Sequence, residues 1–279
     1  MSAAASLAKL ALRCPCGSGR VEPAFAYDAP PAGETKFDFG GAPYRRRYLR
    51  CVDCGHWYAD TDMDLGALYS GSYVDSTYGQ KMRQTFERII GLPAGKSDNA
   101  GRVARILSFA AEALKGVASP TLLDIGSGLG VFPYKMKEAG WRCVALDPDP
   151  RASAHARETV GVEAITGDFM KLPEQAAGMF HAVTLNKVLE HVADPTEMLR
   201  KAARHVKPGG FVYVEVPDVA AAVEGPGREE FFIEHLHVFS AESLLLLARQ
   251  AGLRVLAVEA VREPSSKYTL RAFLAPPAP

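Results

Sequence analysis

A glycine-rich turn is the first part of this 279-residue chain whose residue types and spacing could do chemistry. Asp124 is followed by Gly126, Gly128 and Gly130, a G-x-G-x-G pattern at the end of an apolar run. Glycines let the backbone turn sharply and approach a ligand that a Cβ would exclude. Seventeen residues later Asp147 ends the next apolar run, where its carboxylate could accept both ribose hydroxyls. The spacing predicts a nucleoside site, with a tight strand-to-helix turn as the structural alternative.

Four cysteines near the N-terminus form a second candidate site. They occur as Cys14 with Cys16 and Cys51 with Cys54, two Gly-containing turns separated by 34 residues. Thiolates on two such turns can close a tetrahedral structural zinc site, which stabilises a module too small to form a core alone. The first pair is C-x-C rather than C-x-x-C, so His56 stays open as a substitute fourth ligand. A metal-free cluster of buried cysteines is the alternative to zinc.

The elements that must position these groups follow from the hydrophobic pattern. From residue 121 onward short apolar runs alternate with amphipathic stretches, as in a parallel sheet covered on both faces. The expected strands are 121–125, 142–146, 162–166, 182–185, 211–216, 255–261 and 268–274. The expected helices are 97–115, 131–139, 150–158, 195–205 and 241–251. The fold class is therefore α/β.

The chain divides into three zones. Residues 1–62 hold the cysteine pairs and short aromatic or β-branched runs, and are expected to form a small β-rich, zinc-binding module. Residues 63–96 form a link containing Tyr69, Tyr73 and Tyr78. Residues 97–279 form the α/β domain.

Composition limits the partners. The chain has 32 Lys and Arg against 32 Asp and Glu, so no net charge attracts a polyanion, and we expect no nucleic-acid partner. No apolar run approaches the roughly 18 residues of a spanning helix, so we expect no membrane partner. Five cysteines, an odd number, fit a reducing compartment, and we expect a cytoplasmic protein that is a monomer or a homodimer.

The glycine turn resembles that of the class I S-adenosylmethionine-dependent methyltransferases, and the resemblance covers about residues 97–279. The motifs Leu189–Pro195 and Lys207–Gly210 are also similar to this superfamily. The resemblance implies a Rossmann-like, seven-stranded, mostly parallel sheet whose last strand is antiparallel.

The same resemblance implies roles for the residues that match. Asp124 and the three glycines would border the methionine portion of S-adenosylmethionine, and Asp147 would hold its ribose. Asp168 and Phe169 would flank the adenine, and Asn186 would lie beside the transferred methyl group.

The N-terminal cysteine module, the Tyr-rich link and the segment Glu234–Ser240 together resemble the nucleotide-sugar C-methyltransferases. The resemblance implies that Tyr73 (or Tyr69), His235 and Glu234 surround the sugar, with His235 as general base oriented by Glu234. His237 and His191 are alternative bases. Two features depart from that family's pattern: the C-x-C pair, and the expected absence of the large domain that those enzymes carry after the methyltransferase core. The acceptor atom therefore stays open between oxygen and carbon.

Three functions are consistent with these features. The first is a methyltransferase acting on a small, sugar-like or nucleotide-sugar acceptor. The second is a ribosomal RNA methyltransferase whose zinc module grips RNA, which the neutral charge disfavours. The third is a non-catalytic nucleoside-binding protein with a zinc recruitment module, which the intact turn and Asp147 disfavour.

Overall fold

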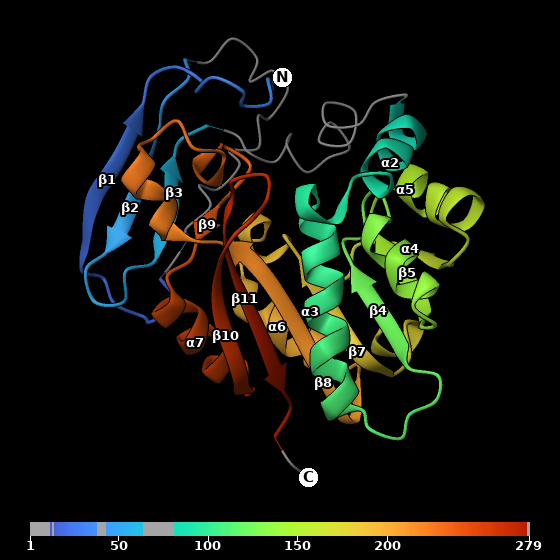
Figure 1. Cartoon of the computed structure of the whole chain (residues 1–279). Coiled ribbons are helices and arrows are strands. Elements are labelled where there is room, and N and C mark those ends of the chain that lie inside the picture. The colour runs from blue at the N-terminus through green and yellow to red at the C-terminus, as the bar shows by residue number, and fades with distance from the viewer. Residues whose placement is uncertain (1–11, 13, 38–42, 64–80, 278–279) are drawn as a thin grey trace, which may run out of the picture.

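The chain forms two sheets that lie side by side (Figure 1). The computed structural model describes residues 12, 14–37, 43–63 and 81–277. A seven-stranded sheet has the order β10-β11-β8-β7-β4-β5-β6, and a four-stranded sheet has the order β1-β2-β3-β9. Among the described residues, no helix is long and apolar enough to span a bilayer.

The large sheet has the expected architecture. Its strands are β4 (Thr121–Ile125), β5 (Arg142–Asp147), β6 (Glu163–Thr166), β7 (Phe180–Asn186), β8 (Val206–Pro217), β10 (Arg254–Arg262) and β11 (Tyr268–Ala275). Strands β4 to β8 pair in parallel, while β11 runs antiparallel to both β8 and β10. The predicted seven-stranded, mostly parallel sheet is confirmed.

Alternation along the strands separates two apolar cores, one on each face. In β4, Leu123 and Ile125 belong to the core beside α6 (Pro195–Ala203) and α7 (Ala241–Gln250). Leu122 belongs to the opposite core, beside α3 (Asp98–Ala113) and α4 (Val131–Glu138). A strand turns successive side chains to opposite faces, so a run buried on both faces holds the sheet between two helical layers.

Helix boundaries follow their capping residues. Ser97, Asp149, Asp194 and Ser240 each accept a hydrogen bond from a main-chain N–H of the helix that they precede. The predicted helix at 150–158 is α5 (Pro150–His155) continued by a π-helical turn, η4 (Ala156–Val160). Short 3₁₀ turns are η3 (Ala94–Lys96), η5 (Glu174–Ala176), η6 (Leu189–His191), η7 (Val219–Glu224) and η8 (Glu229–Phe231).

The expected link contains a helix that the sequence analysis did not assign. Helix α2 (Met82–Ile90) buries Phe86, whose ring packs edge-on against Tyr134 at 5.3 Å and His155 at 5.2 Å between ring centroids. One aromatic side chain thus fixes α2 on the helical layer of α4 and α5.

The last strand of the small sheet comes from the C-terminal half of the chain. Strands β1 (Val21–Tyr27), β2 (Arg46–Cys51) and β3 (Trp57–Thr61) are antiparallel, and β9 (His237–Val238) pairs with β3. Aromatic rings of both segments share one core, and Trp57 lies 5.1 Å from Phe231. The module expected at residues 1–62 is therefore joined to the segment between β8 and α7.

Candidate functional site

The three glycines lie at the carboxyl ends of β4 and β5, and each has a positive φ. Gly126, Gly128 and Gly130 have φ values of 72°, 50° and 68°, a region that favours glycine. A Cβ on Gly126 would lie 2.7 Å from a methyl group of Val188, and one on Gly130 would lie 2.7 Å from Val160. The turn therefore needs glycine for both conformation and space.

Asp147 lies against this turn. Its Oδ2 accepts the N–H of Gly128 at 2.8 Å, and its Oδ1 accepts the N–H of Asp149 at 2.9 Å. Burial raises the pKa of this carboxyl group. Each carboxylate oxygen has a further lone pair, so the group can still accept hydroxyl donors. The structure brings the turn and the carboxylate together as the spacing predicts.

Asp124 and Asn186 form a polar pair at the ends of β4 and β7. Asp124 Oδ1 accepts Thr184 Oγ1 at 2.7 Å and Asn186 Nδ2 at 2.8 Å, and burial raises the pKa of Asp124 to about 6. Asn186 Oδ1 is buried with no hydrogen-bond partner among the described residues. An acceptor left over at this position fits the ammonium group of a methionine moiety, so these residues are suited to S-adenosylmethionine.

Asp168 and Phe169 have different surroundings. Asp168 is exposed; it accepts the N–H of Met170 at 3.0 Å and pairs with Lys171 at 3.1 Å. The Phe169 ring is buried in the core, 5.1 Å from Lys201 Nζ. The expectation that Asp168 and Phe169 flank adenine stays a prediction, and the buried Phe169 ring means that only its main chain would face the ligand.

His191 and His235 meet on the side of the sheet where β7 ends. Their ring centroids are 5.0 Å apart. His191 Nδ1 lies 2.8 Å from the carbonyl oxygen of Glu234, and His235 Nδ1 lies 3.0 Å from that of Glu230. Carbonyls only accept, so both Nδ1 atoms carry the proton and both Nε2 atoms keep a lone pair. The expected orientation of His235 by Glu234 is thus corrected: the carbonyl of Glu230 holds that ring.

Glu190 completes this group, and sequence reasoning missed it. Its side chain is fully buried, and neither carboxylate oxygen has a hydrogen-bond partner among the described residues. One oxygen lies within 4.8 Å of a ring nitrogen of both His191 and His235. Burial raises the pKa of Glu190 to about 8. The Glu-His pair directly after the fourth expected strand was the available signal.

Burial also acts on the histidines. It lowers the pKa of His191 and holds that of His235 well below its ordinary value, with the neighbouring His191 acting in the same direction. Burial therefore makes both rings weaker bases than a free imidazole. Both rings are neutral at neutral pH.

His237 and His56 lie together at the junction of the two sheets. His237 Nδ1 is 3.0 Å from His56 Nε2, and His56 Nδ1 is 3.1 Å from Ser243 Oγ. Burial lowers the pKa of His237 to about 4. Both ring nitrogens of His56 therefore interact with His237 and Ser243 rather than with the cysteines. His237 contacts His56 at the junction of the two sheets.

The cysteines converge as expected. Cys14 Sγ lies 3.2 Å from both Cys16 Sγ and Cys54 Sγ, and Cys16 Sγ lies 3.5 Å from Cys51 Sγ. All four sulfurs lie within 4.8 Å of one another and none forms a disulfide. A tetrahedral zinc with Zn–S bonds of about 2.3 Å requires sulfurs about 3.8 Å apart, so this donor set fits the ion.

The tyrosines of the expected link, Tyr69, Tyr73 and Tyr78, lie outside the described residues, so the structure does not place them.

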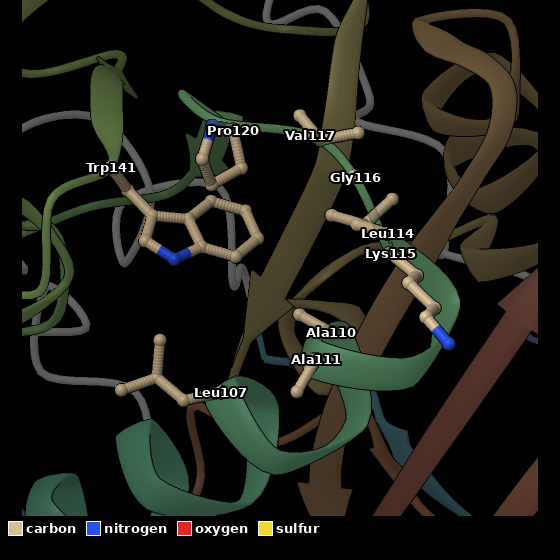
Figure 2. Close-up of a pocket in the computed structure, with 9 residues that line it drawn as sticks. All are labelled: Leu107, Ala110, Ala111, Leu114, Lys115, Gly116, Val117, Pro120 and Trp141. Atoms are coloured by element: carbon tan, nitrogen blue, oxygen red, sulfur yellow. The ribbon is translucent and has the colours of Figure 1, made fainter.

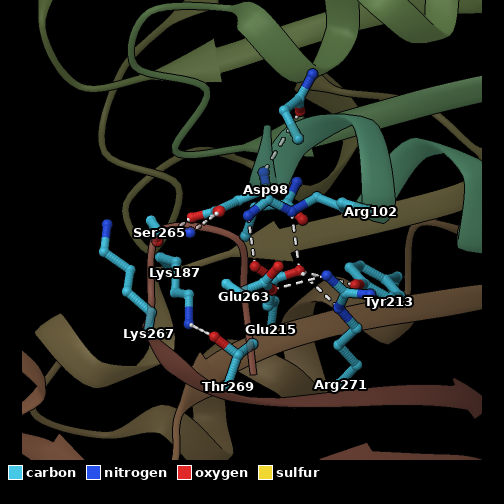
Figure 3. A network of polar contacts seen from close by, with 12 residues as sticks. Asp98, Arg102, Lys187, Tyr213, Glu215, Glu263, Ser265, Lys267, Thr269 and Arg271 are labelled. Atoms are coloured by element: carbon cyan, nitrogen blue, oxygen red, sulfur yellow. Dashed lines mark hydrogen bonds and ion pairs between the residues drawn. The ribbon is translucent and has the colours of Figure 1, made fainter. Parts of the chain in front are cut away.

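A buried ion network joins α3, β8 and β11 (Figure 3). The carboxylate of Glu215 on β8 accepts three hydrogen bonds. They come from Arg102 Nε at 2.9 Å, from Arg102 Nη2, and from the hydroxyl of Tyr213 at 2.8 Å. Arg271 on β11 lies 3.4 Å from the same carboxylate, and these cations lower the pKa of Glu215 to about 2. The carbonyl of Glu215 accepts the N–H of Lys187, whose φ of 58° starts the turn toward Glu190.

A pocket lies at the opposite edge of the sheet, between the end of α3 and Trp141 (Figure 2). Its volume is about 320 Å³, and apolar side chains such as Leu107 and Leu114 line it. Ligands of open α/β sheets bind outside the carboxyl ends of the strands, so this pocket is separate from the candidate site.

The sequence matches known methyltransferases. The sequence model of a methyltransferase domain family matches residues 96–258. A ubiquinone biosynthesis O-methyltransferase from Caulobacter vibrioides is 39% identical over 101 residues, which cover 34% of this chain and 39% of that protein. A cypemycin N-terminal methyltransferase from a Streptomyces species is 30% identical over 184 residues, covering 63% of this chain and 71% of that protein.

Solved structures agree on the fold. The magnesium protoporphyrin IX methyltransferase of Synechocystis, solved with bound S-adenosylhomocysteine, has a TM-score of 0.55 and 13% identity, covering 74% of this chain and 99% of that one. The chain spans well under two thirds of the ubiquinone relative. Since the family match covers more than half of the sequence, this chain belongs to the methyltransferase domain family, and residues 96–258 form its methyltransferase domain.

Proposed function

We propose that the protein transfers a methyl group from S-adenosylmethionine to a small, hydroxyl-bearing acceptor of sugar-like or nucleotide-sugar type. The observation that carries the proposal is the convergence of His191 and His235 at the end of β7, beside the turn that would hold the cofactor. S-adenosylmethionine supplies a methyl group on a positive sulfur that is already a good leaving group. The chain's own residues must then align the acceptor and activate its oxygen or carbon.

The geometry supports the proposed cofactor-binding assignments. Asp147 would accept the ribose hydroxyls, Asn186 Oδ1 would accept the methionine ammonium, and the glycine turn would approach the ligand closely. His235 is the proposed group that activates the acceptor, with an Nε2 lone pair directed by the carbonyl of Glu230. A sugar hydroxyl is a poor nucleophile until it loses its proton, whereas an amine needs little help.

The N-terminal cluster is proposed to hold one structural zinc ion through Cys14, Cys16, Cys51 and Cys54. Four thiolates leave no open coordination position, so this ion would stabilise the module and take no part in methyl transfer.

A labelled-methyl assay tests the function. The wild-type protein is offered nucleotide sugars, free sugars, a polyhydroxylated phenol, a peptide amine and RNA. Transfer to a sugar-type acceptor is expected. His235→Ala should lower kcat by about 100- to 10,000-fold and leave cofactor affinity unchanged. Transfer to RNA alone, or a fully active His235→Ala protein, contradicts the proposal.

A further inference from the structure

We propose that Glu190, His191 and His235 bind a divalent cation on the acceptor side of the site. One carboxylate oxygen and one nitrogen of each ring lie within 4.8 Å of one another. Two imidazoles and a carboxylate form a ligand set typical of first-row transition metals, with coordination positions left for water or substrate.

The histidines are oriented as metal ligands require. A ligating histidine donates its other ring N–H to a carbonyl or carboxylate, which fixes the tautomer and the ring plane. Here the carbonyl of Glu234 holds His191 Nδ1 and the carbonyl of Glu230 holds His235 Nδ1, at 2.8 Å and 3.0 Å. Each ring thus presents its Nε2 lone pair as the donor atom that can bind a metal ion.

Glu190 supplies an independent observation. A fully buried carboxylate with no hydrogen-bond donor on either oxygen, among the described residues, is a costly arrangement without a counterion. Lys187 attracts this carboxylate electrostatically, but its ammonium group donates to Thr269 Oγ1 at 2.8 Å. The hydrogen-bonding capacity of Glu190 thus remains open to an ion.

The spacing allows an ion with little movement. Metal–ligand bonds of about 2.1 Å require donor atoms no more than about 4.2 Å apart, so side chains spread over 4.8 Å need only a small closure. The main chain around them is already fixed: Leu236 N–H bonds the carbonyl of Glu190 at 2.7 Å, tying η6 to the segment that carries His235.

The role of the ion rests on the proposed function, whereas its binding does not. A hydroxyl bound at an open position would lose its proton to bulk water at lower pH, and the oxygen would keep the electron pair that attacks the methyl group. His191 and His235 would then act on the acceptor through the ion. This arrangement favours oxygen over carbon as the acceptor atom.

The test is a manganese titration of the full chain loaded with one equivalent of zinc, followed by electron paramagnetic resonance. Zinc fills the thiolate cluster, and Mn²⁺ prefers oxygen and nitrogen ligands to thiolates. We expect one Mn²⁺ per chain. Glu190→Gln and His191→Asn should each weaken binding by about tenfold or more, and cofactor binding by these variants checks that they fold.

Glu263→Gln is the matched control, because Glu263 is also a buried carboxylate but already pairs with Arg271 at 2.7 Å. It should bind Mn²⁺ as the wild type does. Absence of Mn²⁺ binding, or equal binding by wild type, Glu190→Gln and His191→Asn, overturns the site. Full methyl transfer after removal of all cations except the zinc overturns the ion's role but leaves the proposed function intact. Mn²⁺ binding without transfer to any acceptor refutes the function and leaves the site intact.

Discussion

At the scale of residues, the candidate site depends on carboxylates in contrasting surroundings. Asp147 faces main-chain N–H donors, Glu215 faces arginines, and Glu190 has no hydrogen-bond donor among the described residues. The same functional group is therefore suited to three tasks: accepting hydroxyls, fixing strands and holding a cation.

Asp147→Ala is expected to weaken S-adenosylmethionine binding at least tenfold, because charge-assisted hydrogen bonds to ribose are worth about 1.5 to 3 kcal/mol and 1.4 kcal/mol corresponds to one decade. Isothermal calorimetry gives the affinity. Asp149→Ala is the control, since the Asp149 carboxylate caps α5 through Arg151 N–H at 2.7 Å and, among the described residues, forms no hydrogen bond with the glycine turn. Equal affinities of the Asp147→Ala and wild-type proteins would remove Asp147 from the site.

Glu215 should make folding stability depend on acid pH. Its folded pKa of about 2 lies below the ordinary 4.5, so its stabilisation is fully present above about pH 4.5 and is lost as pH falls toward 2. The shift corresponds to about 3 kcal/mol. Denaturant unfolding from about pH 6 to about pH 3 should show this loss in the wild type and a shallower slope in Glu215→Gln. Parallel curves for the two proteins would contradict the assignment.

At the scale of elements, the residue that caps α7 also contacts the cysteine module. Ser240 Oγ accepts Ser243 N–H at 3.0 Å and donates to the carbonyl of Cys54 at 2.5 Å. Ser97 caps α3 with a single bond from Ala100 N–H. One serine therefore starts a helix and anchors the cysteine turn, while the other only starts a helix.

Ser240→Ala should accordingly destabilise the protein more than Ser97→Ala. Loss of a cap costs about 1 kcal/mol, and loss of the additional bond to Cys54 about 1 kcal/mol more. Chemical denaturation with unchanged m-values measures both. Equal losses for the two variants would show that the Cys54 contact contributes nothing.

The sequence predicted the elements of the large sheet because their signals are local: strand runs such as 121–125, caps such as Ser97 and Asp194, and positive-φ glycines. It could not predict that β9, two residues long, pairs with β3, because periodicity carries no information on distant partners. Glu190 was missed for the same reason: its neighbour His235 comes from a segment 45 positions later in the chain. Phe169 was assigned to adenine on motif position alone, which could not show that its apolar ring is buried in the core.

At the scale of the whole molecule, hydrogen bonds join the cysteine module to the segment that carries His235. Tyr48 of β2 donates its hydroxyl to the carbonyl of His235 at 2.6 Å, and Glu34 accepts the N–H of Ile233 at 2.8 Å while it pairs with Arg46 at 2.6 Å. The segment that carries His235 is thus held by the module, whereas the glycine turn follows β4 of the seven-stranded sheet.

Elemental analysis should find one zinc per chain. Cys51→Ser should lose the metal and most of the methyl transfer but keep S-adenosylmethionine affinity, because only the His235 segment depends on the module. His56→Ala should keep its zinc, since both ring nitrogens bond elsewhere. Zinc-free wild-type protein purified without chelator, or zinc loss in His56→Ala, would contradict this assignment.

The pairing of β3 with β9 also dictates an order of events during synthesis. His56 and His237 are 181 positions apart, so at about 5 to 20 residues per second the ribosome delivers β9 roughly 10 to 40 s after β3. During that interval β3 presents an open edge, a template for pairing with other nascent chains. The four cysteines of the cluster have all been translated by residue 54, so early zinc capture would hold β2 and β3 together while their last strand is still being made.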